Sequence, residues 1–299
     1  MSQQENKKPG WGGRLSDPGA LRELLGRHGF HFSKSLGQNF LINPSVCPRM
    51  AEACGAQECA GVLEVGPGVG VLTWELSQVA KKVCAVELDT RLFPVLEETL
   101  AGCDNVKVIR GDVMKLDLSR LVQEEFGGGP ICVCANLPYY ITSPVLLRLL
   151  EEELPLRAIT VMVQKEAAAR LCAAPGTREF GAVSVAVHYR SVPRVLFPVS
   201  RGSFLPPPKV DSAVIRLDLR EEPPVEVADE AWFFRVARGA FAQRRKTAAN
   251  SLSSALGIPK PQVEAALAAV GAAGARAERL TLEQLAALSN RLLEAVASP

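Results

Sequence analysis

The sequence predicts an α/β domain with a largely parallel sheet, followed by a smaller all-helical domain. Short β-branched, apolar runs alternate with helix-compatible stretches from Ala60 to about Leu217, the pattern of a parallel sheet covered by helices. The Glu-Glu-Pro-Pro segment at 221–224 can neither continue a central strand nor begin a packed helix, which indicates a linker. After Ala231 the chain is rich in Ala and Leu at helical spacing.

The expected strands, in chain order, are Val62–Val65, Val83–Val86, Val106–Ile109, Ile131–Ala135, Ile159–Val163, a run around Val183–His188 and another around Ala213–Leu217. No helix is evident between the last two. Several prolines lie between them and predict a long loop that feeds an antiparallel strand pair at one sheet edge.

Domain boundaries follow from the same pattern. We expect an N-terminal extension over residues 1–30, partly mobile, because its first 13 residues are polar and rich in glycine. The α/β domain should span 31–222 and the helical domain 223–299. Gly257, Gly271 and Gly274 should divide the helical domain into three or four helices.

Composition limits the class of protein. Hydrophobic residues make up 47% of the 299 residues and charged residues 22%, enough for a sizeable core. The net charge is +2, which excludes a uniformly basic coat, so any nucleic-acid surface must be a local patch. No apolar run approaches the length of a membrane span, and the N-terminus lacks the apolar stretch of an export signal. We therefore expect a cytoplasmic protein without membrane partners.

Cysteine and histidine usage argues against a metal site. The eight cysteines are Cys47, Cys54, Cys59, Cys84, Cys103, Cys132, Cys134 and Cys172. No pair has the C-x-x-C spacing of a zinc or redox motif, and the three histidines are widely separated. We expect the thiols to be reduced and mostly packed, and no metal to be bound.

A glycine-rich turn joins the first strand to the first helix of the α/β domain. Glu-Val-Gly-Pro-Gly-Val-Gly at 64–70 precedes the helix-compatible stretch Val71–Ser77, the strand, turn and helix order of a Rossmann-like cofactor loop. Gly66 and Gly68 let the backbone approach a ligand closely. Glu87 closes the second strand, where a carboxylate can accept both hydroxyls of a ribose.

The same turn departs from the dinucleotide fingerprint. Val71 stands where that fingerprint has its third glycine, and Pro67 removes a backbone donor for a phosphate. A nucleoside cofactor without phosphates fits better, which favours S-adenosyl-L-methionine and disfavours a nicotinamide dehydrogenase. Asp112, after the third strand, could accept a hydrogen bond from the adenine amino group, although Asp after a strand is more often a helix cap.

The most informative stretch, Asn-Leu-Pro-Tyr-Tyr at 136–140, follows the fourth strand, at the edge where open α/β sheets bind ligands. An exocyclic aromatic amine is a poor nucleophile because its lone pair is delocalised into the ring. The side-chain oxygen of Asn136 and the backbone oxygen of Leu137 could accept its hydrogens and direct the lone pair at a sulfonium methyl. Pro138 stiffens the loop, and Tyr139 could stack on the base. A strand-terminating turn with a buried tyrosine is the structural alternative.

Five ordered motifs carry a resemblance to a known family: Ser35–Leu41, Glu64–Gly70, Asn136–Pro144, Phe204–Ser212 and Phe241–Lys246. With them the chain resembles the ribosomal RNA adenine dimethyltransferases, and within that family the bacterial small-subunit enzymes most closely. The resemblance runs from about His31 to the C-terminus. It implies dimethylation at N6 of two adjacent adenosines in a 3′-terminal hairpin of small-subunit ribosomal RNA, with S-adenosyl-L-methionine as donor and a role in subunit biogenesis.

The resemblance also implies roles for single residues. Asn39 and Leu41 would line the methionine end of the cofactor, and Phe204 would be a second aromatic side chain against the flipped base. Implied cofactor contacts at the sheet edge are Gly66, Glu87, Asp112 and Asn136, in agreement with the argument from strand ends. The implied partner is an immature small ribosomal subunit, and we expect the free protein to be a monomer.

A basic window lies in the helical domain. From Ala231 to Lys260 the sequence has no Asp or Glu and six basic residues, namely Arg235, Arg238, Arg244, Arg245, Lys246 and Lys260. The first five are the candidate RNA contacts, since such a patch suits phosphates, and a solvated helix face is the alternative. The aromatic residues between them, Trp232, Phe233, Phe234 and Phe241, are expected in the core. Lys34, Arg201 and Lys209 could extend the basic surface.

Two rival functions remain open from the sequence. One is the related large-subunit methyltransferase that confers macrolide resistance, although the motifs at 36–39 and 244–246 look more like the small-subunit form. The other is a non-catalytic ribosome-assembly or transcription factor of the same fold. The intact motif from Asn136 to Tyr139 argues against a loss of activity.

Overall fold

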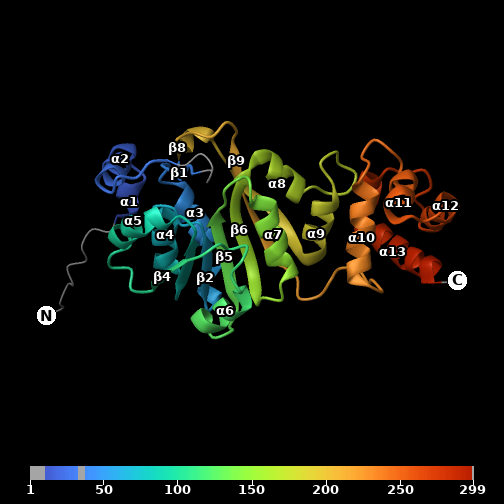
Figure 1. Ribbon diagram of the computed structural model, residues 1–299, viewed down its shortest axis with the longest axis horizontal. Helices are drawn as coiled ribbons and strands as arrows, with labels where there is room; N and C mark the ends of the chain where they lie inside the picture. Colours follow the sequence, from blue (N-terminus) through green and yellow to red (C-terminus); the bar gives the residue numbers. More distant parts are fainter. Residues whose placement is uncertain (1–10, 33–37, 298–299) are drawn as a thin grey trace. The chain divides into compact units, whose positions relative to one another are not determined.

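A computed structural model describes residues 11–32 and 38–297 (Figure 1). The chain forms two compact units. The first unit comprises the chain up to Ala168 together with Arg194–Leu219, and the second comprises Ala169–Pro193 and the chain from Arg220 onward. The second unit therefore includes a segment that precedes the linker expected at 221–224.

A seven-stranded sheet has the strand order β4-β3-β2-β5-β6-β9-β7. Its strands are β2 (Gly61–Val65), β3 (Val83–Glu87), β4 (Val106–Arg110), β5 (Ile131–Asn136), β6 (Leu156–Gln164), β7 (Ser191–Val199) and β9 (Ser212–Leu219). The first five in that order are parallel to one another, and β9 is antiparallel to β6. The predicted parallel sheet with an antiparallel edge is confirmed.

The central strands are buried on both faces, which explains why they appear in the sequence as continuous apolar runs. Every residue of β2 and β3 is buried, and Val62 lies opposite Val83 on one side and Cys132 on the other. The helices of this unit are α3 (Val46–Ala53), α4 (Val71–Val79), α5 (Phe93–Thr99), α6 (Leu118–Phe126), α7 (Thr142–Glu151) and α8 (Lys165–Leu171), which runs on into the second unit (Figure 1).

Two N-terminal helices belong to the packed core, although the sequence analysis assigned no element there. They are α1 (Gly12–Leu15) and α2 (Pro18–Arg27). Asp17 caps α2 by accepting a hydrogen bond from the backbone N–H of Ala20 at 2.7 Å. The core residues they contribute are all fully or almost fully buried, namely Leu15, Leu21, Leu24 and Leu25.

One predicted strand is wrong. The run around 183–188 forms helix α9 (Ala182–Arg190), and the strand of this region, β7, begins directly after it. The alternating valines fit a strand, but Gly181 and Ser184 begin a helix, with the Ser184 hydroxyl accepting the Gly181 N–H at 3.1 Å. Tyr189 packs on Phe233 with ring centroids 5.1 Å apart, so tertiary packing overrides the local pattern.

The second unit is helical, as predicted. It contains α9, α10 (Glu230–Phe241), α11 (Ala248–Leu256), α12 (Lys260–Ala269) and α13 (Leu282–Ala297). Side chains cap three of these helices: Asp229 accepts from the Trp232 N–H at 2.8 Å, Thr247 from the Asn250 N–H at 3.4 Å and Thr281 from the Gln284 N–H at 3.2 Å. The four helices after the linker confirm the predicted three or four.

The eight cysteines are free thiols, and six of them are buried, as expected. Cys103 and Cys172 are partly exposed. Cys59 and Cys132 lie side by side in the core of the first unit, with 3.3 Å between their sulfur atoms.

Candidate active site

A pocket in the first unit lies at the carboxyl ends of β2, β3 and β5. It brings together every cofactor and catalytic residue proposed from the sequence: Asn39, Leu41, Gly66, Gly68, Glu87, Asp112, Asn136, Leu137, Pro138, Tyr139 and Phe204. These residues come from six separate segments of the chain. Parallel strands end at the same edge of a sheet, so their chemistry-bearing ends meet there.

The glycine turn lines one side of the pocket. Its first glycine, Gly66, donates its N–H to the Val86 carbonyl at 3.0 Å, which ties the turn to β3. Gly66 has φ +70°, and a Cβ added there would meet no atom within 4 Å, so open space lies over this backbone. Gly68 has φ +62°, and a Cβ added there would lie 3.1 Å from a carbon of the Phe40 ring. A ligand can therefore approach the main chain closely at Gly66.

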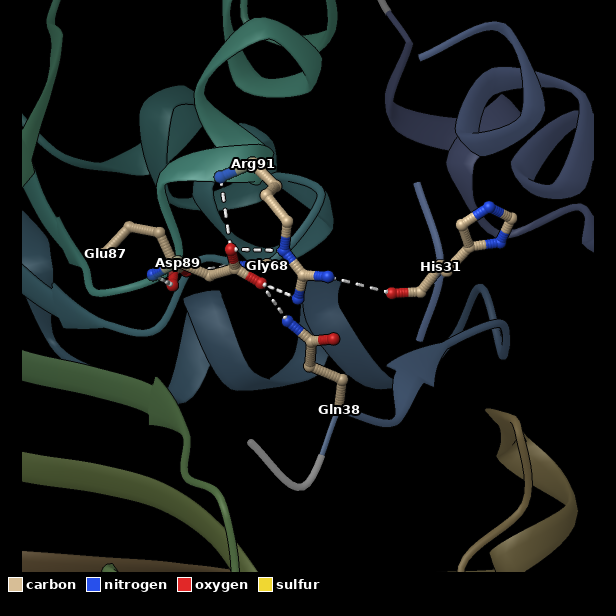
Figure 2. Close-up of polar contacts among 6 residues, drawn as sticks. All are labelled: His31, Gln38, Gly68, Glu87, Asp89 and Arg91. Carbon is tan, nitrogen blue, oxygen red and sulfur yellow. Dashed lines mark hydrogen bonds and ion pairs between the residues drawn. The ribbon is translucent and has the colours of Figure 1, made fainter. Parts of the chain in front are cut away.

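Glu87 is fixed by two backbone donors (Figure 2). Its Oε1 accepts the Asp89 N–H at 2.8 Å, and its Oε2 accepts the Gly68 N–H at 3.3 Å. Burial raises the pKa of Glu87, and the backbone hydrogen bonds from Asp89 and Gly68 offset part of that rise. The glycine turn and the acid at the end of β3 thus position each other.

A second acid, Glu64, lines the same pocket and was given no role from the sequence. It is 1% exposed, and its Oε2 has no hydrogen-bond partner among the described residues. Burial raises the pKa of Glu64 to about 8, and the nearby Glu87 adds to the rise. The sequence feature that could have identified Glu64 is a single acidic residue inside an otherwise apolar, buried strand.

Asp112 lies in a turn after β4. Its Oδ1 accepts the Met114 N–H at 2.9 Å, so it closes a turn and not the helix cap that was the sequence alternative. Arg148, from α7, donates hydrogen bonds to the backbone carbonyls of Val113 and, at 2.6 Å, of Leu116. Sequence reasoning missed this arginine, which holds the loop that carries Asp112.

The loop after β5 is held at both ends. Asn136 is the last residue of the strand, and the Pro138 carbonyl accepts from the Ile141 N–H at 3.1 Å. Tyr139 shares a hydrogen bond with the Ser212 hydroxyl at 2.7 Å, which ties the ring to β9. Burial raises the pKa of Tyr139, and the Ser212 hydroxyl offsets part of that rise. The tyrosine is half-buried and faces the pocket rather than filling the core.

Two residues placed in the site only by resemblance, Leu41 and Phe204, are neighbours in a small second sheet. Strand β1 (Phe40–Leu41) pairs antiparallel with β8 (Phe204–Leu205), and Leu41 lies opposite Phe204. The pairing is extended by the Ile42 N–H, which donates to the Ser203 carbonyl at 2.8 Å. Two-residue strands have no periodicity, which is why the sequence did not predict this sheet.

The candidate RNA contacts lie on the second unit. All five, Arg235, Arg238, Arg244, Arg245 and Lys246, are exposed, on α10 or in the turn that follows it. Arg244 donates to the Arg178 carbonyl. Phe233 is fully buried, and the partly buried Trp232, Phe234 and Phe241 pack against the same core cluster, so the aromatic residues belong to the core as predicted. In the first unit Arg201 and Lys209 are exposed, whereas Lys34 and Ser35–Gly37 lie outside the described residues.

Over residues 11–32 and 38–297, no group of three or more His, Cys, Asp or Glu side chains is arranged to hold a metal ion. Nor does the part of the chain that the structure describes include a helix long and apolar enough to cross a membrane.

Comparisons with known proteins agree on one family. The family model for ribosomal RNA adenine dimethylase matches residues 29–293. A protein of Geobacillus thermodenitrificans named ribosomal RNA small subunit methyltransferase A is 48% identical, over 93% of this chain and 97% of its own length. A protein of the same name from Bacillus licheniformis is 46% identical, over 94% of this chain and 98% of its own length. A crystal structure of the 23S rRNA methyltransferase ErmE is 30% identical with a TM-score of 0.66, covering 85% of this chain and 99% of its own. A dimethyladenosine transferase from Plasmodium falciparum shares the fold, at 24% identity and a TM-score of 0.69, covering 85% of this chain and 96% of its own.

Proposed function

The chain belongs to the ribosomal RNA adenine dimethylase family, and from that premise we propose that it transfers methyl groups from S-adenosyl-L-methionine to the N6 amino nitrogens of adenosines in small-subunit ribosomal RNA, twice per base. The observation that carries the proposal is one pocket that holds the Asn136–Tyr139 loop, Glu87 and the glycine turn together. The small-subunit assignment is supported by relatives 46–48% identical over nearly their whole length, compared with 30% for the large-subunit enzyme of known structure.

The residues of the pocket fit such a cofactor. Glu87, fixed by two backbone donors, would accept hydrogen bonds from the ribose hydroxyls with its remaining lone pairs. Asp112 would accept from the adenine amino group, and Asn39 and Leu41 would line the methionine end. Gly66 leaves open space for a close approach. When bound, S-adenosyl-L-methionine supplies an electrophilic methyl group on a positively charged sulfur.

The loop after β5 then activates and orients the target amine. The Asn136 side-chain oxygen and the Leu137 carbonyl would each accept one hydrogen of the adenine amino group, which draws the lone pair out of the ring. Tyr139 would stack on the base, and its hydrogen bond to Ser212 ties the ring to β9. The amino proton leaves after methyl transfer, so these residues need to position the amine and not to deprotonate it first.

A base inside a duplex cannot reach this pocket. The target adenosine must therefore lie in a loop or be turned out of its stack, and aromatic side chains compensate the lost stacking. Phe204 would contact the turned-out base from the β8 side of the pocket. The exposed basic residues of the second unit would bind RNA phosphates in an immature small ribosomal subunit.

The proposal is tested by offering labelled S-adenosyl-L-methionine with unmethylated small subunits, with large-subunit RNA and with naked RNA, followed by nucleoside analysis. Dimethyladenosine that forms only with the small subunit supports the proposal. Label in large-subunit RNA would instead indicate the resistance-type enzyme. Cofactor binding without transfer to any substrate would indicate a non-catalytic assembly factor.

The Asn136→Ala variant separates catalysis from binding. Because Asn136 supplies one of the two acceptors for the amine, the variant should lose methyl transfer while it still binds small subunits. A variant that fails at both would show that Asn136 does more than orient the amine.

A further inference from the structure

Asp89 and Arg91, directly after β3, form an ion pair to which the mechanism above gives no role (Figure 2). Arg91 donates from Nε to Asp89 Oδ1 at 2.9 Å and from Nη2 to Oδ2 at 2.6 Å, a two-point contact. The Asp89 side chain is 6% exposed. The Arg91 hydrogen bonds hold the pKa of the Asp89 carboxyl below its usual range, so the acid is ionised at neutral pH.

Asp89 joins two walls of the pocket. Its Oδ2 also accepts from the Gln38 side chain at 2.7 Å, and its own backbone N–H donates to Glu87 Oε1 at 2.8 Å. Gln38 directly precedes Asn39 and strand β1, which line the pocket and, under the proposed function, would contact the methionine end of the cofactor. Asp89 therefore links the segment that carries Asn39 to Glu87, through its carboxylate on one side and its backbone N–H on the other.

Arg91 ties the same point to the N-terminal part of the chain. Its Nη1 donates to the His31 carbonyl at 3.4 Å, as Figure 2 shows, and its guanidinium lies 5.0 Å from the ring centroid of Phe30. Phe30 in turn packs on Phe40, with ring centroids 5.9 Å apart. The pair thus holds residues on two stretches of chain beside the pocket, around His31 and around Gln38.

We propose that Asp89 and Arg91 are positioning residues for the cofactor, and that the Asp89–Gln38 hydrogen bond sets the affinity for it. The inference rests on the proposed function. Without the carboxylate, Gln38 loses its hydrogen bond to the loop after β3, so the segment that carries Asn39 is held less firmly beside Glu87. Binding must then order it, and this ordering weakens affinity without changing the chemistry once the cofactor is in place.

The test measures the Kd of S-adenosyl-L-homocysteine by calorimetry for the full chain and for Asp89→Asn, Gln38→Ala and the double variant. In Asp89→Asn an amide N–H₂ replaces one carboxylate oxygen, and it then faces Arg91 Nε–H at the Oδ1 position, or both Arg91 Nη2–H and the Gln38 N–H₂ at the Oδ2 position, so at least one charge-assisted hydrogen bond is lost. A lost hydrogen bond to a charged group is worth about 1.5–3 kcal/mol, so each single variant should bind at least about tenfold more weakly. The double variant should bind S-adenosyl-L-homocysteine only slightly more weakly than the single variant with the higher Kd, because both single changes disturb the same Asp89–Gln38 contact.

A positioning role also predicts a split in the kinetics. With small subunits as substrate, Asp89→Asn should raise the KM for S-adenosyl-L-methionine about tenfold and leave kcat within about twofold, since no reacting atom is touched. A fall in kcat at saturating cofactor equal to the fall in kcat/KM would contradict the proposal.

Glu125→Gln is the matched control. Glu125 is also an ionised carboxylate on a nearly buried side chain, 7% exposed, and its partners Lys82 and Lys107 lie at the opposite end of the parallel strands. The control should lower the melting temperature about as much as Asp89→Asn and leave the Kd unchanged. Equal loss of affinity in both variants, unchanged affinity in Asp89→Asn, or additive losses in the double variant would each overturn the inference. A full chain that binds no S-adenosyl-L-homocysteine would instead contradict the proposed cofactor.

Discussion

Single side chains decide how the proposed reaction is positioned, and Tyr139 offers a direct measurement. The Tyr139→Phe variant keeps the ring and loses the hydrogen bond to Ser212, so methyl transfer should fall by up to about tenfold, the effect of one hydrogen bond. Tyr139→Ala also loses stacking, worth about 1–3 kcal/mol per base, and should fall further. Initial rates of label transfer to small subunits measure both.

The same chemical change in the second unit provides the control for Tyr139. Tyr189→Phe removes a hydroxyl that donates to Glu230 at 3.3 Å within the helical unit. Its transfer rate should stay close to that of the unaltered chain. A comparable loss in Tyr189→Phe would show that the Tyr139 result reflects general destabilisation.

Glu64 should make stability depend on pH. Its pKa of about 8 in the folded chain lies above the value of an unfolded carboxyl, so between about pH 5 and pH 8 the folded state binds more protons than the unfolded state. The free energy of unfolding should therefore fall as pH rises through this window. In Glu64→Gln that part of the slope should vanish, which urea unfolding at intervals from pH 5 to pH 9 would measure. An identical slope in both proteins would contradict the buried, protonated acid.

Residues that follow a strand were predictable from the sequence, and residues that act through distant contacts were not. Glu87 and Asn136 stand at strand ends, where the topology of a parallel sheet places ligands. Asp89 and Arg148 gain their roles from partners far along the chain, Gln38 and the carbonyl of Val113. No local pattern shows such pairs.

Among the secondary-structure elements, continuous apolar runs predicted strands correctly, whereas alternating or very short patterns did not. Strands β2, β3 and β5 were predicted because they are buried on both faces, whereas the edge strand β4 has no buried residue and was predicted from its β-branched residues. Helix α9 was mistaken for a strand because its valines alternate, and the contacts that decide its structure come from α10. The short strands β1 and β8 depend on each other and have no separate signal.

Helix α2 should contribute to stability as a core element. Leu24 is fully buried in the core of the first unit, so Leu24→Ala should lower the free energy of unfolding by about 2–5 kcal/mol. Its neighbour Glu23 has an exposed side chain, and Glu23→Ala should change the free energy by less than about 1 kcal/mol. Denaturant unfolding of both variants measures the difference, and equal values would contradict the packing of this helix.

Helix α7 positions the loop after β4. Because Arg148 donates to the carbonyls of Val113 and Leu116, Arg148→Met should free the loop that carries Asp112. We expect S-adenosyl-L-homocysteine to bind at least several-fold more weakly, by loss of hydrogen bonds from a charged donor. Arg120→Met is the control, since Arg120 is exposed and, among the described residues, its guanidinium pairs with its helix neighbour Glu124. A similar loss in both variants would contradict the role of Arg148.

For the whole molecule, a net charge of +2 requires that RNA affinity come from a local surface. If Arg244 and Arg245 each contact a phosphate, the double change to Gln should reduce the slope of log affinity against log salt by about 1.4–1.8. Titrations of small subunits at several salt concentrations measure the slope. Changing Arg22 and Arg120, which are exposed on the first unit, to Gln gives the charge-matched control, whose slope should stay the same.

The packed thiols have a practical consequence for measuring motion. Thiolates are the form that alkylating reagents attack, and burial raises the pKa of Cys84 to about 12 and that of Cys172 to about 11. At neutral pH Cys84, which is fully buried, should be alkylated mainly when the segment around it opens, whereas the partly exposed Cys172 should react without such an opening. Cys84 belongs to the sheet of the first unit and Cys172 to the second. Mass spectrometry of the alkylated Cys84 peptide over time would therefore report the opening free energy of the sheet in the first unit, with the Cys172 peptide as the partly exposed reference.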